Sequence, residues 1–338
     1  MKLKFEYIWL DGYTPEPNLR SKTRIINMDP DTVPIIDDLP SWTFDGSSTN
    51  QALGNKSDCI LQPERIYPDP FRDDGYLVLC EVLNDKGEPH LSNDRNKISD
   101  DNEEWWFGFE QEYVLYKNGR ILGWPEDGYP LPQGNYYCGV GNNNVVGRDI
   151  MEDHMNACLT AGLIITGTNA EVLLGQWEYQ LFGKGAKNTS DDLWISRYIL
   201  QRLVEIENIT INYHPKPIKG DWNGAGMHCN FSTSGMRAPG GIREIEATCK
   251  KMSNYIAANA ALGPSANTPA QQLLRFSGWV HRHQQPLAKK YARQIPHIAL
   301  NGRASLAHRH QYHLNTICDY PIDDAKPTAF RTQTAIAL

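Results

Sequence analysis

The chain has 338 residues, a mass of 38.3 kDa, a net charge of −7 and a pI near 5.8. This length is enough for one large or two moderate hydrophobic cores. The acidic balance gives no global electrostatic support for binding nucleic acid, so we expect no nucleic-acid partner.

The apolar runs and the cysteines indicate the cellular location. The opening segment, MKLKFEYIWLDGY, contains an apolar run too short for a signal peptide, and no stretch could span a bilayer. The seven cysteines are odd in number and lack the paired spacing of a metal site. We therefore expect reduced thiols in a cytoplasmic protein with no membrane partner.

The first 85 or so residues combine short β-type runs, KFEYIWL and YLVLCEVL, with turns rich in proline and glycine. Residues 84–104 are polar and are interpreted as a linker or exposed connection. This change in composition predicts two domains, at 1–86 and 87–338.

Residues 106–116, WFGFEQEYVLY, follow as a predicted strand. Alternation along a strand places Glu110 and Glu112 on one face, two residues apart. The stretch GNYYCGVGNNN, 134–144, lacks the spacing of a phosphate-binding glycine motif and is interpreted as a loop.

Two helices come next. One is predicted from Asp149 to Leu163, with an apolar side and an end at Gly162. The apolar side is expected to contain Ile150, Met151, Met155, Cys158 and Leu159. The other is predicted to begin with the capping residues Thr189-Ser190-Asp191-Asp192 and to run through Trp194, Tyr198, Ile199 and Leu203. With strand-type segments between and after them, the chain has an α+β pattern.

Five side chains are candidates for metal binding: Glu110, Glu112, Glu171, Glu178 and His228. A single glutamate is usually a solvated surface group and a single histidine is usually structural. Together, however, in apolar strings poor in lysine and arginine, four carboxylates would need a cation. A bend at Gly175 would let Glu171 and Glu178 point the same way. Oxygen-rich ligation favours Mg²⁺ or Mn²⁺.

These strings resemble glutamine synthetase of the type II, eukaryote-like form, from Trp9 to about Arg237. The matching stretches are WLDGYTP, WTFDGSST, DPFR, LVLCEV, FGFEQEY, GWP, PQGNYYCGVG, GRDI, GTNAEV, GQWEYQ and DWNGAGMHCNFST. The resemblance implies a small β-grasp domain, followed by a catalytic domain with an antiparallel sheet flanked by helices.

The implied reaction is ATP-dependent ligation of ammonia to L-glutamate, giving L-glutamine through γ-glutamyl phosphate, with two or three Mg²⁺ or Mn²⁺ ions per site. The implied partners are ATP, glutamate, ammonia and copies of the same chain, which would form a decamer of two stacked rings. Two alternatives stay open: an impaired homologue acting as a binding or assembly subunit, and a ligase joining glutamate to a larger amine.

The resemblance also implies roles for individual residues. Glu112, Glu171 and Glu178 would hold one metal, and Glu110 and His228 the other. Asn223 and Gly224 would bind glutamate, while Asn230, Phe231 and Ser232 would lie at the nucleotide. Asp45, which could by itself be a plain turn residue, would reach a neighbouring subunit and deprotonate ammonium, and this favours ammonia over a larger amine.

The last quarter departs from the family. We find no RLTGxHET, NRGASIRI or EDRRP segment, and Glu246 is the last glutamate. Residues 247–338 contain 11 Lys and Arg against 3 Asp, whereas residues 1–246 contain 22 against 37 acidic residues. There are three explanations: a metal-binding tail rich in histidine, a diverged ending, and a shifted reading frame that begins somewhere between about Tyr255 and Leu274. We favour the last for residues 255–338, and KKMSNYI still predicts a helix.

Overall fold

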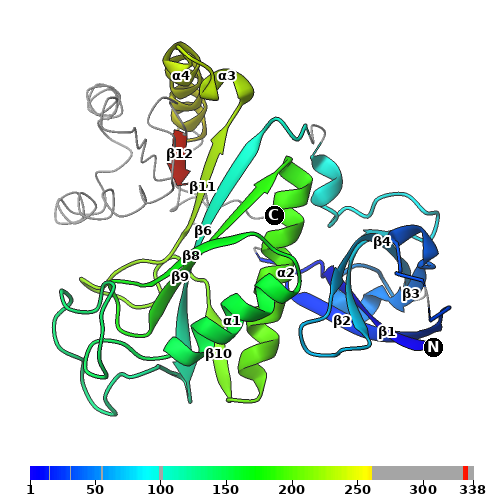
Figure 1. The fold of residues 1–338 in the computed structure, drawn as a ribbon, viewed down its shortest axis with the longest axis horizontal. Coiled ribbons are helices and arrows are strands. Elements are labelled where there is room, and N and C mark those ends of the chain that lie inside the picture. Colours follow the sequence, from blue (N-terminus) through cyan, green and yellow to red (C-terminus); the bar gives the residue numbers. More distant parts are fainter. Residues whose placement is uncertain (15, 31, 55, 99–101, 261–329, 334–338) are drawn as a thin grey trace.

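The structure is a computed structural model, which describes residues 1–338 except 15, 31, 55, 99–101, 261–329 and 334–338. The predicted α+β architecture is confirmed: Figure 1 shows two sheets with helices between them. In the part of the chain that the structure describes, no helix is long and apolar enough to cross a membrane. The segment that the competing explanations concern, residues 255–338, lies almost entirely outside the described residues.

The first sheet is mixed and has the strand order β2-β1-β5-β4-β3. Its strands are β1 (Lys2–Leu10), β2 (Leu19–Asn27), β3 (Trp42–Asp45), β4 (Asp58–Pro68) and β5 (Gly75–Leu83). The two runs expected from sequence are β1 and β5, which pair in parallel, while the other pairs are antiparallel. Three 3₁₀ turns accompany this part: η1 (Ile36–Asp38), η2 (Gly46–Thr49) and η3 (Arg95–Lys97).

The second sheet has the order β12-β11-β6-β9-β8, and every pairing in it is antiparallel, as predicted. Its long central strand is β6 (Trp106–Lys117), with β8 (Ile165–Ala170), β9 (Gln176–Lys184), β11 (Met227–Ser232) and β12 (Phe330–Gln333). Short strands β7 (Arg120–Ile121) and β10 (Ile209–Asn212) also pair with β6. Residues 134–144 contain neither helix nor strand, as expected of a loop.

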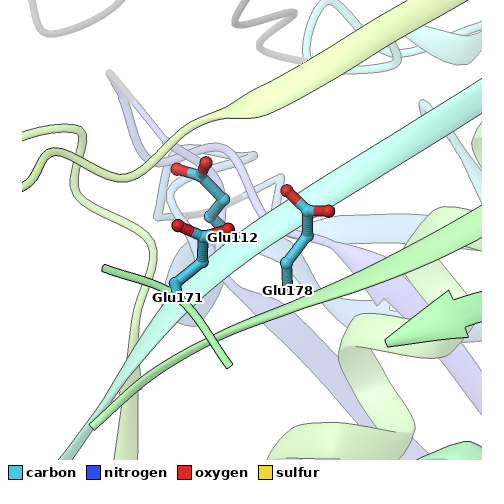
Figure 2. Close-up of side chains that lie close together, drawn as sticks. All are labelled: Glu112, Glu171 and Glu178. Atoms are coloured by element: carbon cyan, nitrogen blue, oxygen red, sulfur yellow. The ribbon is translucent and has the colours of Figure 1, made fainter. Parts of the chain in front are cut away.

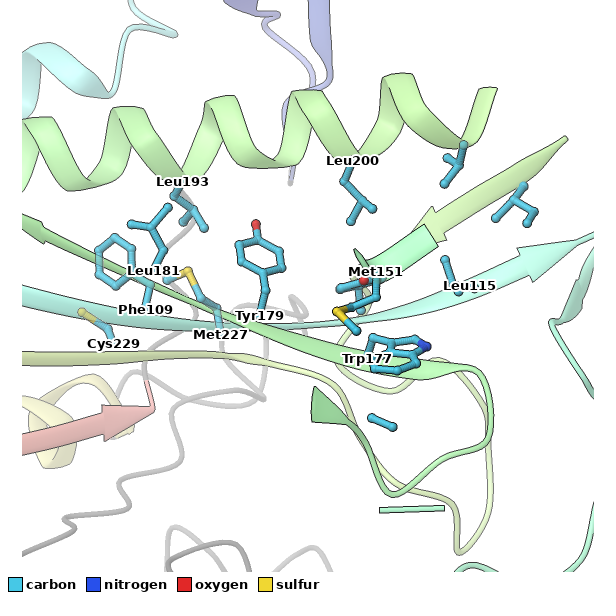
Figure 3. Close-up of a cluster of buried hydrophobic side chains, with 14 residues drawn as sticks. Phe109, Leu115, Met151, Trp177, Tyr179, Leu181, Leu193, Leu200, Met227 and Cys229 are labelled. Carbon is cyan, nitrogen blue, oxygen red and sulfur yellow. The ribbon is translucent and has the colours of Figure 1, made fainter. Parts of the chain in front are cut away.

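Helices α1 (Arg148–Thr160) and α2 (Ala186–Glu205) separate the two sheets. One side of this layer packs on β6 and β9 of the second sheet (Figure 3), where Leu193 and Leu200 meet Phe109 and Tyr179. The other side packs on the first sheet, where Ile195 and Ile199 meet Ile8, Leu77 and Leu79. Helices α3 (Ser234–Arg237) and α4 (Ile242–Ala260) follow β11, and α4 contains the predicted KKMSNYI helix.

The predicted beginning of α2 is wrong. The helix starts at Ala186, directly after Gly185, whose positive φ of 80° ends the preceding strand. Thr189 to Asp192 therefore lie inside the helix and are buried. The two aspartates have arginine partners outside the helix: Asp191 pairs with Arg95, after the first domain, at 2.9 Å, and Asp192 pairs with Arg65 of the first domain at 3.1 Å.

The apolar side of α1 also differs in part from the prediction. Met151 and Cys158 are buried as expected, and Gly162 follows the helix with φ 83°. Leu159, however, is 51% exposed, and the buried position on that side belongs to His154. Its Nε2 lies 2.9 Å from the Ser196 carbonyl oxygen of α2, so a hydrogen bond replaces apolar contact there.

Candidate active site

Strand β6 carries two carboxylates on the face turned away from α2. Phe109 and Tyr113 pack toward α2, so the alternate residues Glu110 and Glu112 point to the other side of the sheet. Both are nevertheless buried, with 3% and 6% exposure. Ionised side chains so poorly exposed need compensating charge or hydrogen bonds.

Three carboxylates converge on this face (Figure 2). Glu178 of β9 is the direct cross-strand partner of Glu112, and Glu171 lies just beyond the end of β8. One oxygen from each lies within 4.8 Å of the others. The bend expected at Gly175 is present, with φ 86°, and it brings Glu171 and Glu178 to the same place although they are seven residues apart.

The electrostatics of this cluster favour a cation. Burial raises the pKa of Glu178 well above its usual value, and the neighbouring carboxylates Glu171 and Glu112 raise it further. Polar groups offset this only in part. Asn169 Nδ2 donates to Glu171 at 3.0 Å and Gln180 Nε2 to Glu178 at 3.2 Å. Three buried carboxylates at this separation can hold a divalent ion that prefers oxygen ligands.

The remaining two candidate ligands form a pair on the same face. His228 of β11 is the cross-strand partner of Glu110, and its Nδ1 lies 2.7 Å from Glu110 Oε2. Asn230 is two residues further along β11, and its Nδ2 donates to Glu110 Oε1 at 3.1 Å. The structure therefore places the five residues on one face as a group of three carboxylates and a Glu110–His228 pair.

The loop before β11 holds Asn223 and Gly224 beside the carboxylates. Gln176, at the start of β9, accepts from Asn223 Nδ2 at 3.1 Å and donates to the Gly224 carbonyl at 2.9 Å. Gln133 accepts from the Asn223 backbone N–H at 2.7 Å. Sequence reasoning missed both glutamines, although alternation along β9 would have put Gln176 on the face of Glu178.

The far end of β11 is surrounded by aromatic and cationic side chains. Phe231 points away from the Asn230 face by strand alternation, and its ring lies 5.9 Å from that of Trp105 in a stacked arrangement. Arg237 donates to the carbonyl and the hydroxyl of Ser232 at 2.7 and 2.9 Å and covers the Trp106 ring at 4.0 Å. Neither Trp105 nor Arg237 was predicted. Trp105 lies far in sequence from its neighbour Phe231 on β11, so a local pattern does not reveal their contact.

Asp45 is the candidate that the structure does not bring to the carboxylates. It caps η2 in the first domain, accepting from the Ser47 N–H at 2.9 Å and from the Ser47 hydroxyl at 2.6 Å. These hydrogen bonds lower the pKa of Asp45, so its carboxylate stays ionised. The first sheet packs on α1 and α2, whereas the carboxylates lie on the opposite face of the second sheet.

Comparison with known proteins places this site in a family. Residues 3–85 match "Glutamine synthetase, beta-Grasp domain", and residues 90–256 match "Glutamine synthetase, catalytic domain". The glutamine synthetase of Bradyrhizobium diazoefficiens is 54% identical over 250 residues, covering 73% of this chain and 72% of the relative. That of Saccharomyces cerevisiae is 48% identical over 269 residues, with coverage of 78% and 71%.

These matches define the class of the molecule as a ligase with a β-grasp domain and a catalytic domain. The chain belongs to the glutamine synthetase family. The catalytic match ends at residue 256, next to the region where the family's sequence signatures cease.

Proposed function

We propose that this protein makes L-glutamine from L-glutamate and ammonia at the expense of ATP, through γ-glutamyl phosphate. The observation that carries the proposal is the buried group Glu112, Glu171 and Glu178 beside the Glu110–His228 pair on one face of the catalytic sheet. The ordered placement of both groups in a member of this family favours a catalytic role over a binding or assembly subunit.

We propose two or three divalent ions per site, Mg²⁺ or Mn²⁺. The residues present fit two of them: Glu112, Glu171 and Glu178 would hold one, and Glu110 with His228 a second. When bound, such ions neutralise charge on the phosphate oxygens and on the attacking carboxylate. The chain's own contribution is to keep these oxygens together in a site with little access to water.

Glutamate and ATP would occupy opposite ends of this face. Asn223 and Gly224, held by Gln176, would bind the amino acid part of glutamate. Asn230, Phe231 and Ser232 would lie along the nucleotide. Trp106, the cross-strand partner of Ser232, and Arg237, which lies over its ring, offer an aromatic surface and a cation on this face, which suits stacking of an adenine base.

We propose that Asp45 serves the site of another copy of the chain in a homo-oligomer of ring type, two stacked pentamers. The layer of α1 and α2 and the second sheet lie between its domain and the carboxylates of the same chain. An ionised carboxylate there would bind ammonium and take up its proton as nitrogen attacks. Light scattering should give a mass near ten subunits, and a monodisperse active monomer would contradict this assembly.

We also propose a domain boundary between residues 86 and 87. We propose a cytoplasmic location as well, since six described cysteines are free thiols.

For residues 255–338 a shifted reading frame is the preferred explanation. Translation of the encoding DNA in the other two frames should restore the missing signatures, and their absence from both frames would reject it.

The reaction is tested by phosphate release from ATP. Release should require Mg²⁺ and glutamate and should rise with ammonium. Release that ignores ammonium but responds to an alkylamine would favour a different glutamate–amine ligase. We expect slow turnover by the unmodified chain, because loss of a phosphate clamp commonly reduces the rate about a thousandfold or more.

A fusion separates the site from the atypical tail. Residues 1–254 joined to a conventional family C-terminus should show ammonium-dependent activity, and Glu171→Ala or His228→Ala in that fusion should abolish it. Near-normal turnover by the unmodified chain would instead show that its own last quarter supplies the missing groups.

A further inference from the structure

Gln111 is a polar side chain on the apolar face of β6. It lies between Phe109 and Tyr113, which pack against α2, and it is only 2% exposed. A buried amide destabilises a protein unless its hydrogen-bonding groups are satisfied. The partners of Gln111 therefore indicate why an amide, rather than another apolar group, occupies this position.

Its oxygen is held by an arginine from α2. Arg197 Nε donates to Gln111 Oε1 at 3.0 Å, and Nη2 donates to the same oxygen. The guanidinium itself is fixed between two rings, 4.6 Å from the centroid of Trp194 and 5.1 Å from that of Tyr213. This planar fork sets the orientation of the amide.

Its nitrogen is directed at the point where two strands separate. Pairing of β6 with β11 ends at the Gln111–Met227 pair. Directly beyond this pair, Gln111 Nε2 donates to the Glu112 carbonyl at 2.8 Å and to the Gly226 carbonyl at 3.4 Å. One amide thus joins the last residue before β11 to the next residue of β6.

The same two residues fix a carboxylate of the cluster. The Glu112 N–H donates to the Gly226 carbonyl at 2.9 Å, and the Gly226 N–H donates to Glu112 Oε2 at 2.7 Å. Rotation or displacement of Gly226 would therefore move the hydrogen-bond donor that orients Glu112 toward Glu171 and Glu178. The chain of contacts runs from Arg197 through Gln111 to Gly226 and ends on the Glu112 carboxylate.

We infer that Arg197 and Gln111 are positioning residues, which act from the opposite face of the sheet to set the Glu112 carboxylate for divalent metal binding. This rests on the proposed function, because it takes the carboxylate cluster as a metal site. Gln111 lies on the face of β6 opposite Glu112, so neither residue would be a ligand of the ion. Loss of such an outer partner typically weakens metal binding by about 10- to 100-fold.

Gln111→Glu separates positioning from packing. The new carboxylate still accepts from Arg197 and keeps nearly the same volume, but it cannot donate to the Glu112 and Gly226 carbonyls. We expect the Mn²⁺ dissociation constant, measured by electron paramagnetic resonance on the full chain, to rise about tenfold or more. The melting temperature without metal should fall, because an oxygen then faces two carbonyl oxygens, so Mn²⁺ binding is measured well below melting.

Two further variants test the arginine. Arg197→Met should weaken Mn²⁺ binding at a temperature well below melting, while Arg197→Lys, which keeps one donor, should have a smaller effect. Arg202→Met is the matched control, because Arg202 lies on the same helix and pairs with the exposed Glu205. It should leave Mn²⁺ binding unchanged.

Glu178→Gln distinguishes a failure of the proposed metal site from a failure of the positioning role. If it leaves tight Mn²⁺ binding intact, the cluster is not the metal site and both the proposed function and this inference fail. If it weakens Mn²⁺ binding while Gln111→Glu and Arg197→Met bind as tightly as the unmodified chain, only the positioning role is wrong. Weaker binding in both variants with the Arg202 control unchanged supports it.

Discussion

Glu112 and Glu178 are direct cross-strand partners in the β6–β9 pair, so two carboxylates face each other inside the catalytic sheet. Like charges in this position destabilise a sheet, and burial makes their repulsion stronger. Glu171 adds a third carboxylate to the same place. The arrangement stabilises the protein only when a cation is bound. Loss of one of the three charges should therefore raise the free energy of unfolding of the metal-free protein and lower its affinity for metal.

Glu178→Gln should therefore raise the stability of the metal-free protein, by roughly 1–2 kcal/mol. Its burial and the neighbouring carboxylates already hold the pKa of Glu178 well above normal, and the amide removes the charge altogether. Added Mn²⁺ should stabilise the unmodified protein more than the variant, in which the Glu110–His228 pair is left to bind it. Thermal unfolding with and without Mn²⁺ measures both effects.

Glu205→Gln is the control for that experiment. Glu205 is an exposed carboxylate at the end of α2, paired with Arg202. Its substitution should change stability by less than about 1 kcal/mol and preserve the response to Mn²⁺. A Glu178→Gln protein that Mn²⁺ stabilises as much as the unmodified chain would show that Glu178 is not a ligand.

The bend between Glu171 and Glu178 can be tested at Gly175. Its φ is 86°, and an added Cβ would lie 2.7 Å from the Leu122 carbonyl oxygen and 2.9 Å from Ile121 Cγ2. Gly175→Ala should cost about 3 kcal/mol or more, from backbone strain together with overpacking. Because the bend brings Glu171 to the cluster, Mn²⁺ affinity should fall as well.

Gly119→Ala is the matched control, because Gly119 also has a positive φ, 76°, but an added Cβ there meets no atom within 4 Å. It should cost about 1 kcal/mol, and Mn²⁺ affinity should be unchanged. Equal losses of stability in the two variants, measured by urea unfolding, would mean that the contacts around Gly175 do not constrain the bend.

Local patterns predicted much of this site. Alternation along residues 106–116 put Glu110 and Glu112 on one face, and a glycine between Glu171 and Glu178 allowed the required bend. Both features depend on neighbours in sequence, so a single chain reveals them. The antiparallel catalytic sheet and the small first domain came from the family resemblance and not from periodicity alone.

Features that depend on distant contacts were missed or mistaken. Asp191 and Asp192 were interpreted as helix-capping residues, because capping residues and partners of distant arginines have the same composition. Gln111 and Arg197 are 86 positions apart, and only packing of α2 on β6 brings them together. Trp105 and Phe231 likewise meet only through the pairing of β6 with β11.

Arg95 joins the two domains and should be important for stability. Its guanidinium contacts Glu64 at 2.8 Å, Glu81 at 2.5 Å and Asp191 at 2.9 Å. Arg95→Met would leave three poorly exposed carboxylates without their shared cation, which we expect to cost about 3–5 kcal/mol. Urea unfolding followed by tryptophan fluorescence measures the loss.

Lys97→Met provides the comparison for Arg95, since Lys97 lies on the same 3₁₀ turn but pairs with Asp94 at the surface. Its loss should change stability by less than about 1 kcal/mol. If Arg95→Met were as stable as Lys97→Met, the ion pairs between the domains would not hold them together.

Asp192, which lies beside this contact, should make stability depend on pH. Burial raises its pKa from 3.8 to about 6, although Arg65 and a hydrogen bond from Tyr67 Oη at 2.9 Å act in the opposite direction, and Asp191 reinforces the increase. Because the pKa of this acid is higher in the folded state, its stabilising contribution is complete below pH 4 and is lost as the pH rises through 6. The full difference corresponds to roughly 3 kcal/mol.

Asp192→Asn removes this titration. Its stability relative to the unmodified chain should therefore improve steadily between pH 4 and pH 7, as measured by urea unfolding at several pH values. Tyr67→Phe gives an independent check, because loss of its hydrogen bond to the carboxylate should move the midpoint of the change to higher pH. A stability difference between Asp192→Asn and the unmodified chain that is constant over this range would show that Asp192 has the same pKa in the folded and unfolded states.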